Sequence, residues 1–321
     1  MNPAHRSFLA TLAVLLLLGL QACQDERAQR IAHAPRIGLY LADYRGDTLQ
    51  LPRPPERMAL LSPPAESALE QWQAGKRIVA STTRPPELSL PASTEAWPSL
   101  RAALATHQPD LIIADASHYL QPQALRSYLD SLAPVLLVDF GGYQAGRRSL
   151  QTLGRLAARP QQADSLAQGQ QQVVQGLRAT TSTLTAYPTL CLIDGSQATP
   201  LIPGDSTHLA QRLRDAGAAP LTTAKQAYAP LQIDSALAYK PEYVVVISSN
   251  QQALSTWVQR IPNLKRTPAL LNGNAFQLGP GSLRWGPKAH LTLLQLAQML
   301  HPAVPADSLH QAALGTNRPL P

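Results

Sequence analysis

Arginine and aromatic side chains recur in loops that follow short apolar runs of this sequence, where they would suit an anionic ligand with apolar faces. A planar guanidinium makes charge-assisted, often bidentate bonds to carboxylates. Aromatic rings beside the arginines would cover the apolar faces of such a ligand. The loops supply these candidate ligand-binding residues: Ser62, Arg84, His118, Tyr119, Tyr228, Arg284 and Trp285.

The apolar runs that precede these loops have the composition of strands buried on both faces. In the first half of the chain they lie at 58–61, 78–80, 111–114 and 135–138, separated by potential crossover helices at 65–73, 99–106 and 122–132. The second half repeats this order, with strands predicted at 190–193, 243–247 and 275–278 and helices at 207–216, 233–238, 252–259 and 289–300. Such a series predicts parallel sheets, in which ligands bind beyond the carboxyl ends of the strands.

One long helix is predicted between the two halves. Pro160 stands where a first helical position tolerates proline, and an apolar stripe of helical period follows it to Leu177. We therefore divide the chain into a leader (1–22), a tether (23–36), an N-terminal α/β lobe (37–142), a helical connector (143–186), a C-terminal α/β lobe (187–302) and a loose tail (303–321). A hairpin with its turn at 45–47 is expected to begin the first lobe.

The first residues have the pattern of an export signal. After His5 and Arg6, about 13 mostly apolar residues match a signal h-region and are too few to span a bilayer. Leu20-Gln21-Ala22-Cys23 resembles the lipobox of bacterial lipoproteins. This resemblance implies cleavage before Cys23, its lipidation, and a mature protein anchored to a membrane in the periplasm or at the cell surface.

Cysteine content and net charge limit the chemistry and the binding partners that the protein could have. The chain has two cysteines, so a lipidated Cys23 leaves Cys191 alone within an apolar run, where a buried thiol is expected. The formal net charge is +7. Its basic residues are scattered and lack aromatic interleaving, which argues against nucleic acid and leaves anionic small molecules as partners.

Several stretches together resemble the helix-linked, bilobed substrate-binding proteins of bacterial ABC importers for iron-siderophores, haem and cobalamin. The resemblance rests on the segments at 55–66, 98–100, 107–115 and 238–247, and it covers roughly residues 38–301. Within that family, residues 110–117 and the turn at 282–286 look most like ferric dicitrate and hydroxamate siderophore binders. The fold implied is α/β, with two Rossmann-like lobes of mainly parallel sheets joined by a single long α-helix (class III periplasmic binding protein).

The function implied by this resemblance is capture of a ferric-siderophore-type chelate, such as ferric citrate or a hydroxamate, for delivery to an ABC permease dimer. It implies no catalysis and no resident cofactor, and we expect a monomer. In this family an acidic residue on each lobe pairs with the permease, and Asp234 occupies that position in the second lobe. Arg101 stands where the first acid would be, so Glu95 or Glu70 compensates or the partner differs.

Each candidate has a structural alternative. Arg84 and Arg284 would also suit solvated loops, Trp285 a packed interface, and His118 and Tyr119 an ordinary turn.

An esterase is a further possibility, with a nucleophile in Gly204-Asp205-Ser206 and His208 or His290 as the base. Such a serine needs a strand-to-helix elbow, and we interpret this segment more simply as a turn before a helix capped at Thr207. The dispersed histidines show no metal-ligand spacing. Cobalamin, haem, and a non-transport role in ligand or siderophore handling remain the alternative functions.

Overall fold

The computed structural model describes residues 38–82, 94–118, 121–194, 199–222, 228–231, 238, 240–279, 281 and 284–313. Contacts divide the chain into two compact units, residues 1–39 with 50–54 and residues 40–49 with 55–321. The four-stranded and six-stranded sheets that follow both lie in the second unit. Among the described residues, no helix combines the length and hydropathy that crossing a bilayer requires.

The first described strands are β1 (Leu39–Ala42) and β2 (Thr48–Leu51), which flank a tight turn. The Asp43 N–H donates to Asp47 O (2.8 Å), and Gly46 adopts a left-handed φ of 93°. Glycine takes this conformation without the steric cost that a Cβ brings. The predicted turn is confirmed.

The first parallel sheet has the strand order β4-β3-β5-β6. Its strands are β3 (Met58–Leu61), β4 (Ile78–Ser81), β5 (Leu111–Asp115) and β6 (Val135–Val138). The helices between and after them are α2 (Pro63–Gln71), α3 (Trp97–His107), α4 (Pro122–Leu129) and α5 (Tyr143–Leu156). Short 3-10 turns lie at Gly75–Arg77, Thr94–Ala96 and Ala116–His118.

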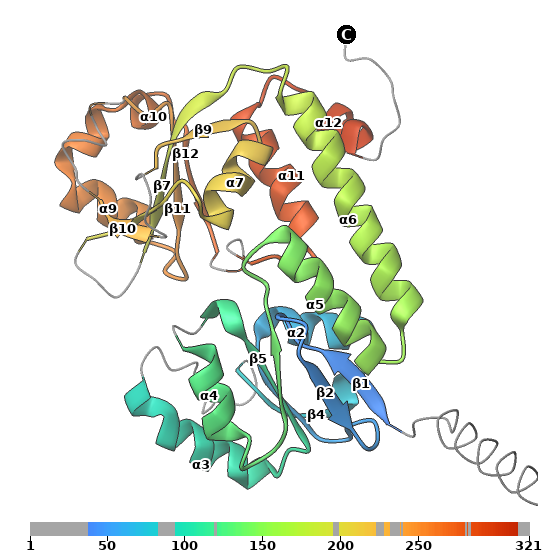
Figure 1. Cartoon of the computed structure of the whole chain (residues 1–321). Helices are drawn as coiled ribbons and strands as arrows, with labels where there is room; N and C mark the ends of the chain where they lie inside the picture. The colour runs from blue at the N-terminus through green and yellow to red at the C-terminus, as the bar shows by residue number, and fades with distance from the viewer. Residues whose placement is uncertain are drawn as a thin grey trace, which may run out of the picture. The chain divides into compact units, whose positions relative to one another are not determined.

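Alternate residues of these strands are buried against different helices. Ala59, Ile112 and Leu137 form one core with residues of α3 and α4, while α2 contacts β3 and α5 contacts β6. Figure 1 shows α3 and α4 together in this lobe. All residues of β3, β5 and β6 are buried. Burial on both faces explains why the strands read as continuous apolar runs.

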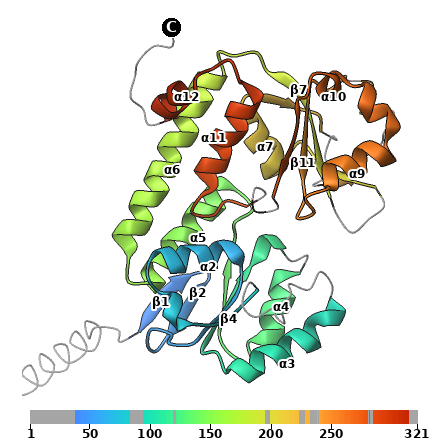
Figure 2. The ribbon, with the colours of Figure 1, turned by 180° about the vertical axis from the view of Figure 1, so that it is seen from behind.

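Helix α6 (Pro160–Thr181) follows α5 and runs beside it, as Figures 1 and 2 both show. The predicted start at Pro160 is confirmed. Gly154 of α5 allows the close approach, because a Cβ at that position would overlap the Ala163 side chain. The buried face of α6 contains Ala163, Gln170 and Val174, and Gln170 is the polar exception that bears on the site.

The second sheet is mixed rather than wholly parallel. Strands β7 (Tyr187–Ile193), β9 (Ala218–Pro220), β11 (Tyr243–Ile247) and β12 (Ala275–Leu278) pair in parallel, whereas β8 (Leu201–Pro203) and β10 (Tyr228–Pro230) extend the sheet antiparallel. Its helices are α7 (His208–Asp215), α9 (Ala253–Arg260), α10 (Pro268–Leu271) and α11 (Ala289–Leu300), with a 3-10 turn at Pro262–Arg266. The predicted helix at 233–238 falls almost wholly outside the described residues.

The tail forms a helix, which the sequence did not predict. Residues Ala306–Ala313 are α12, which lies beside α6 and α11 (Figure 1). Leu309 is 2% exposed and belongs to the core formed with Cys191, Val245 and Leu293. One apolar side chain placed against this core explains why a weakly apolar, proline-rich segment packs.

Candidate functional site

A cavity of about 440 Å³ lies at the carboxyl ends of β5, β6 and β7. Ser117 follows β5, Gly141 follows β6, and Ile193 ends β7, so three strand ends contribute to the wall, as expected for parallel α/β sheets. The cavity is lined by Ser117, Gly141, Ile193, Leu201, Ser206, Thr207, His208, Tyr228 and Arg284. Of the predicted binding residues, the cavity brings together Tyr228 and Arg284.

Arg284 is held in the cavity wall by an ion pair. Its Nη1 donates to Asp115 Oδ2 (2.6 Å) and to Ser117 Oγ (3.0 Å). The Asp115 side chain is 1% exposed, against 21% for Arg284. The other Asp115 oxygen accepts the Ser117 hydroxyl (2.6 Å) and two backbone N–H groups. Asp115 therefore fixes the guanidinium and offsets its charge.

Tyr228 is the large aromatic side chain of the cavity, and 44% of it remains exposed. It comes from β10, the antiparallel edge strand that the sequence did not predict. Burial raises the pKa of Tyr228, while the Arg284 and Arg212 charges oppose the rise. The phenol is therefore neutral at pH 7 and can donate a hydrogen bond or stack against a ligand.

His208 also lines the cavity, although the sequence assigned it no binding role. It is the first residue of α7, and its ring packs against Gly142, where a Cβ would overlap the imidazole. The preceding Thr207 caps the helix by accepting the Ala210 N–H (3.2 Å). The predicted capped turn before α7 is confirmed.

Trp285 is packed rather than presented to the cavity. It is 3% exposed, its Nε1 donates to Gln170 Oε1 (2.9 Å), and its backbone N–H donates to Phe140 O (2.7 Å). The Tyr143 ring meets it edge-on at 5.1 Å, and the Arg212 guanidinium lies 5.0 Å from its ring centroid. These contacts anchor the segment that carries Arg284.

The other predicted site residues lie away from the cavity or outside the described residues. Ser62 is fully buried and caps α2, accepting the Ala65 N–H at 3.3 Å. The described part of His118 is its backbone in a 3-10 turn. The candidates outside the described residues are Cys23, Arg84, Tyr119 and Asp234. Their roles stay predictions.

Arg101 lies on the exposed surface of α3. Its Nη2 donates to Ser131 Oγ (3.0 Å), and its guanidinium stands 5.7 Å from the centroid of the Tyr128 ring. Tyr128 in turn packs against Trp97. Arg101, at the position where the resemblance implies an acid, is thus held by its neighbours. Glu70 and Glu95, the acids that could take this role instead, are exposed.

Cys191 has the surroundings of a structural residue. It is fully buried in β7, and burial raises the pKa of its thiol to about 12. A protonated, inaccessible thiol is unreactive. Within the described part of the chain, no group of three or more His, Cys, Asp or Glu side chains is arranged to hold a metal ion.

Comparison with known proteins identifies the family. The model of the periplasmic binding protein family matches residues 103–281, more than half of the chain. The chain belongs to the periplasmic binding protein family, whose members bind solutes, and this membership indicates a periplasmic location. No curated protein matched the chain.

Solved structures share the fold at low sequence identity. The periplasmic haem-binding protein of Pseudomonas aeruginosa is 20% identical with a TM-score of 0.64, over 78% of this chain and 94% of that one. CeuE of Helicobacter pylori, with bound Ni(II), is 16% identical with a TM-score of 0.68, over 87% and 97%. The haem-binding protein HutB of Vibrio cholerae is 20% identical with a TM-score of 0.64, over 77% and 99%. These similarities support the α/β fold of the family.

Proposed function

We propose that this protein binds an anionic ferric chelate of the siderophore type, such as ferric citrate or a ferric hydroxamate, and delivers it to an ABC permease dimer. The observation that carries the proposal is the cavity at the strand ends, which combines Arg284 and Tyr228 with apolar Ile193 and Leu201. Arginine and hydroxyl groups suit the anionic oxygens of a chelate, while the apolar residues suit its carbon skeleton. The ligand supplies the iron coordination.

Haem is the second candidate. Tyr228 and His208 line the same cavity, and tyrosine and histidine are both established haem-iron ligands in proteins. The haem-binding proteins of Pseudomonas aeruginosa and Vibrio cholerae named above share this fold. Cobalamin and a non-transport role in siderophore handling are further alternatives from the sequence.

The experiment is a titration of the mature protein with ferric citrate, a ferric hydroxamate, a ferric catecholate, haem and cobalamin, followed by tryptophan fluorescence. We expect a dissociation constant of about 1 μM or tighter for a ferric chelate. Tyr228→Ala should weaken binding about tenfold or more, because it removes the exposed aromatic wall of the cavity. Tyr128→Ala, at a half-buried position of α4 that does not line the cavity, is the matched control and should leave binding unchanged.

The competing ligands give distinct results. Haem would be identified as the ligand by two results together. Haem binding would be saturable, with an absorption spectrum altered by Tyr228→Phe or His208→Ala, and the iron chelates would give no response. Equal binding of a chelate by wild type and Tyr228→Ala would show that it binds elsewhere. Absence of a response to every ferric chelate would overturn the siderophore proposal but leave the family membership intact.

A further inference from the structure

The cavity that contains Tyr228 and Arg284, the first cavity, adjoins two others, and each of these shares a described residue with it. A second cavity of about 490 Å³ lies against α5, α6 and α7, and His208 lines both it and the first cavity. A third cavity of about 540 Å³ lies beside the beginnings of α2 and α11, and it shares Arg284 with the first cavity. A ligand larger than the first cavity therefore has to extend past one of these two side chains.

The wall at Arg284 is fixed by hydrogen bonds. Its Nη1 donates to Asp115 Oδ2 (2.6 Å) and to Ser117 Oγ (3.0 Å), and the Asp115 side chain is almost wholly buried. Separating the guanidinium from this carboxylate would leave a buried charge without its partner, which is strongly unfavourable. The first cavity is therefore closed on the side of Arg284.

The wall at His208, in contrast, rests on two glycines. The imidazole ring lies over Gly141, which lines the first cavity, and Gly142, which lines the second. His208 is exposed, and its ring forms no hydrogen bond, ion pair or ring contact with another residue of the part of the chain that the structure describes. Exposed side chains change rotamer on a picosecond to nanosecond timescale. Turning this ring away from the glycines joins the two cavities and roughly doubles the space.

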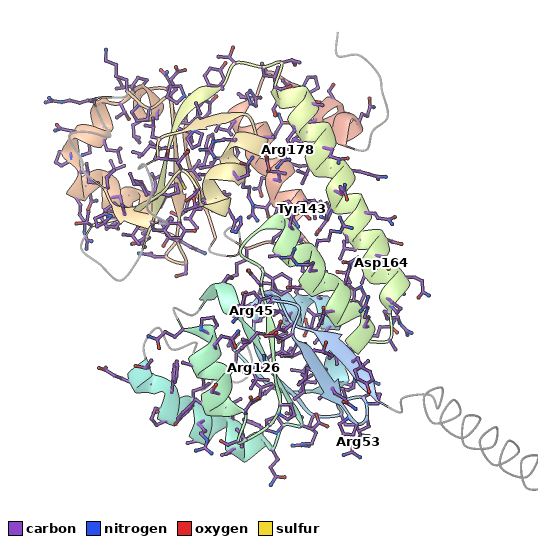
Figure 3. All side chains as sticks on the ribbon, in the orientation of Figure 1. Arg45, Arg53, Arg126, Tyr143, Asp164 and Arg178 are labelled. Atoms are coloured by element: carbon purple, nitrogen blue, oxygen red, sulfur yellow. The ribbon has the colours of Figure 1, made fainter. Side chains whose placement is uncertain are left out.

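The lining of the second cavity is rich in amide groups. It includes four glutamines, Gln144, Gln171, Gln175 and Gln211. A carboxamide both donates and accepts hydrogen bonds. Arg178, which also lines this cavity and is labelled in Figure 3, is matched by Asp215, whose two oxygens accept from Nε and Nη2 at 2.6 and 3.0 Å. The second cavity therefore suits the amide-bearing arm of a ligand.

We propose that His208 determines the size of the chelate that the protein accepts, because its ring is a movable wall between the first and second cavities. This inference rests on the proposed function. While the ring lies on the two glycines, the first cavity alone takes a compact chelate such as ferric citrate. When the ring turns away, the amide-bearing backbone of a linear ferric trihydroxamate extends from Arg284 and Tyr228 into the second cavity.

Fluorescence titrations of the mature protein with ferric citrate and with ferrioxamine B, a linear ferric trihydroxamate, test the proposal. The quantity compared is the ratio of the dissociation constant for ferric citrate to that for ferrioxamine B. His208→Ala removes the wall and the cost of turning the ring, so this ratio should rise about fivefold, the factor that corresponds to one rotamer change. His107→Ala, at the end of α3, is the histidine control and should leave the ratio at its wild-type value, because His107 lines none of the three cavities.

Gly142→Ala tests the contact between the ring and the glycine. The backbone of Gly142 is extended (φ −146°, ψ 171°), which alanine adopts without strain, so overlap of the new Cβ with the His208 ring is the expected effect. The substitution should change the ratio in the wild type but not in the His208→Ala background. Equal changes in both backgrounds, or an unchanged ratio in His208→Ala, would overturn this inference while the proposed function stands. If neither chelate binds to the wild type, the proposed function fails and this inference fails with it.

Discussion

Asp115 holds the Arg284 guanidinium in the cavity wall through an ion pair. Asp115→Asn keeps an oxygen for Ser117 and Phe140 but turns an amide donor toward the Arg284 guanidinium. Two donors then face each other, leaving a half-buried charge without its carboxylate. We expect the free energy of unfolding to fall by about 1–3 kcal/mol, measured by urea denaturation.

The control for this substitution is Asp164→Asn on α6. Asp164, labelled on α6 in Figure 3, is exposed, and among the described residues it accepts a hydrogen bond from Gln151 alone. Its replacement should change the unfolding free energy by less than about 0.5 kcal/mol. A similar small effect at both positions would contradict the structural importance of the Arg284–Asp115 pair.

Tyr228 gives the site a pH dependence if haem is the ligand. The pKa of its hydroxyl is raised by burial, so the phenol stays protonated at neutral pH, and ligation of haem iron by phenolate requires loss of that proton. Haem affinity should therefore increase between pH 7 and pH 9 in the wild type, measured by absorption titration. Tyr228→Phe should abolish this increase, whereas a pH slope retained in the variant would assign the effect to another group.

At the scale of elements, the end of α7 depends on one glycine. Gly217 follows the helix with a φ of 89°, and a Cβ there would overlap the ring of His301, the residue after α11. Gly217→Ala should lower the free energy of unfolding by at least about 1–2 kcal/mol, from backbone strain and the displaced ring. Thermal and urea unfolding measure this loss.

Gly169 in α6 is the matched opposite case. Apart from its chain neighbours and its own helix backbone, no described atom lies within 4 Å of the position its Cβ would occupy. Alanine favours a helix by about 0.5–1 kcal/mol over glycine. Gly169→Ala should therefore raise the free energy of unfolding. Equal destabilisation by both substitutions would show that these local geometries do not control stability.

At the scale of the whole molecule, the sequence predicts a lipid anchor that would hold the protein at a membrane. Cys23→Ala should abolish incorporation of labelled fatty acid and move the protein from the membrane fraction to the soluble fraction, with solute binding unchanged. Cys191→Ala is the control and should keep the lipid, because this thiol is buried in β7. Lipid incorporation in Cys23→Ala, or none in the wild type, would contradict the predicted anchor.

The sequence by itself determined the order of strands and helices. Runs such as Val135–Val138 and Tyr243–Ile247 are found as strands at the predicted bounds, because burial on both faces requires unbroken apolar sequence. Short edge strands such as β10 (Tyr228–Pro230) were missed, since three residues carry no period. The tail helix was missed because its packing depends on a distant core.

Only the tertiary structure decided which candidate residues share a site. Arg284 and Asp115 are 169 positions apart, and no local pattern indicates that one would neutralise the other. The sequence allowed Trp285 either a ligand contact or a packed interface; the structure packs it beside Gln170 and Arg212, and a ligand contact stays a prediction. Local composition specifies which segments become strands and loops, whereas the pairing of charges across the molecule depends on how distant segments pack.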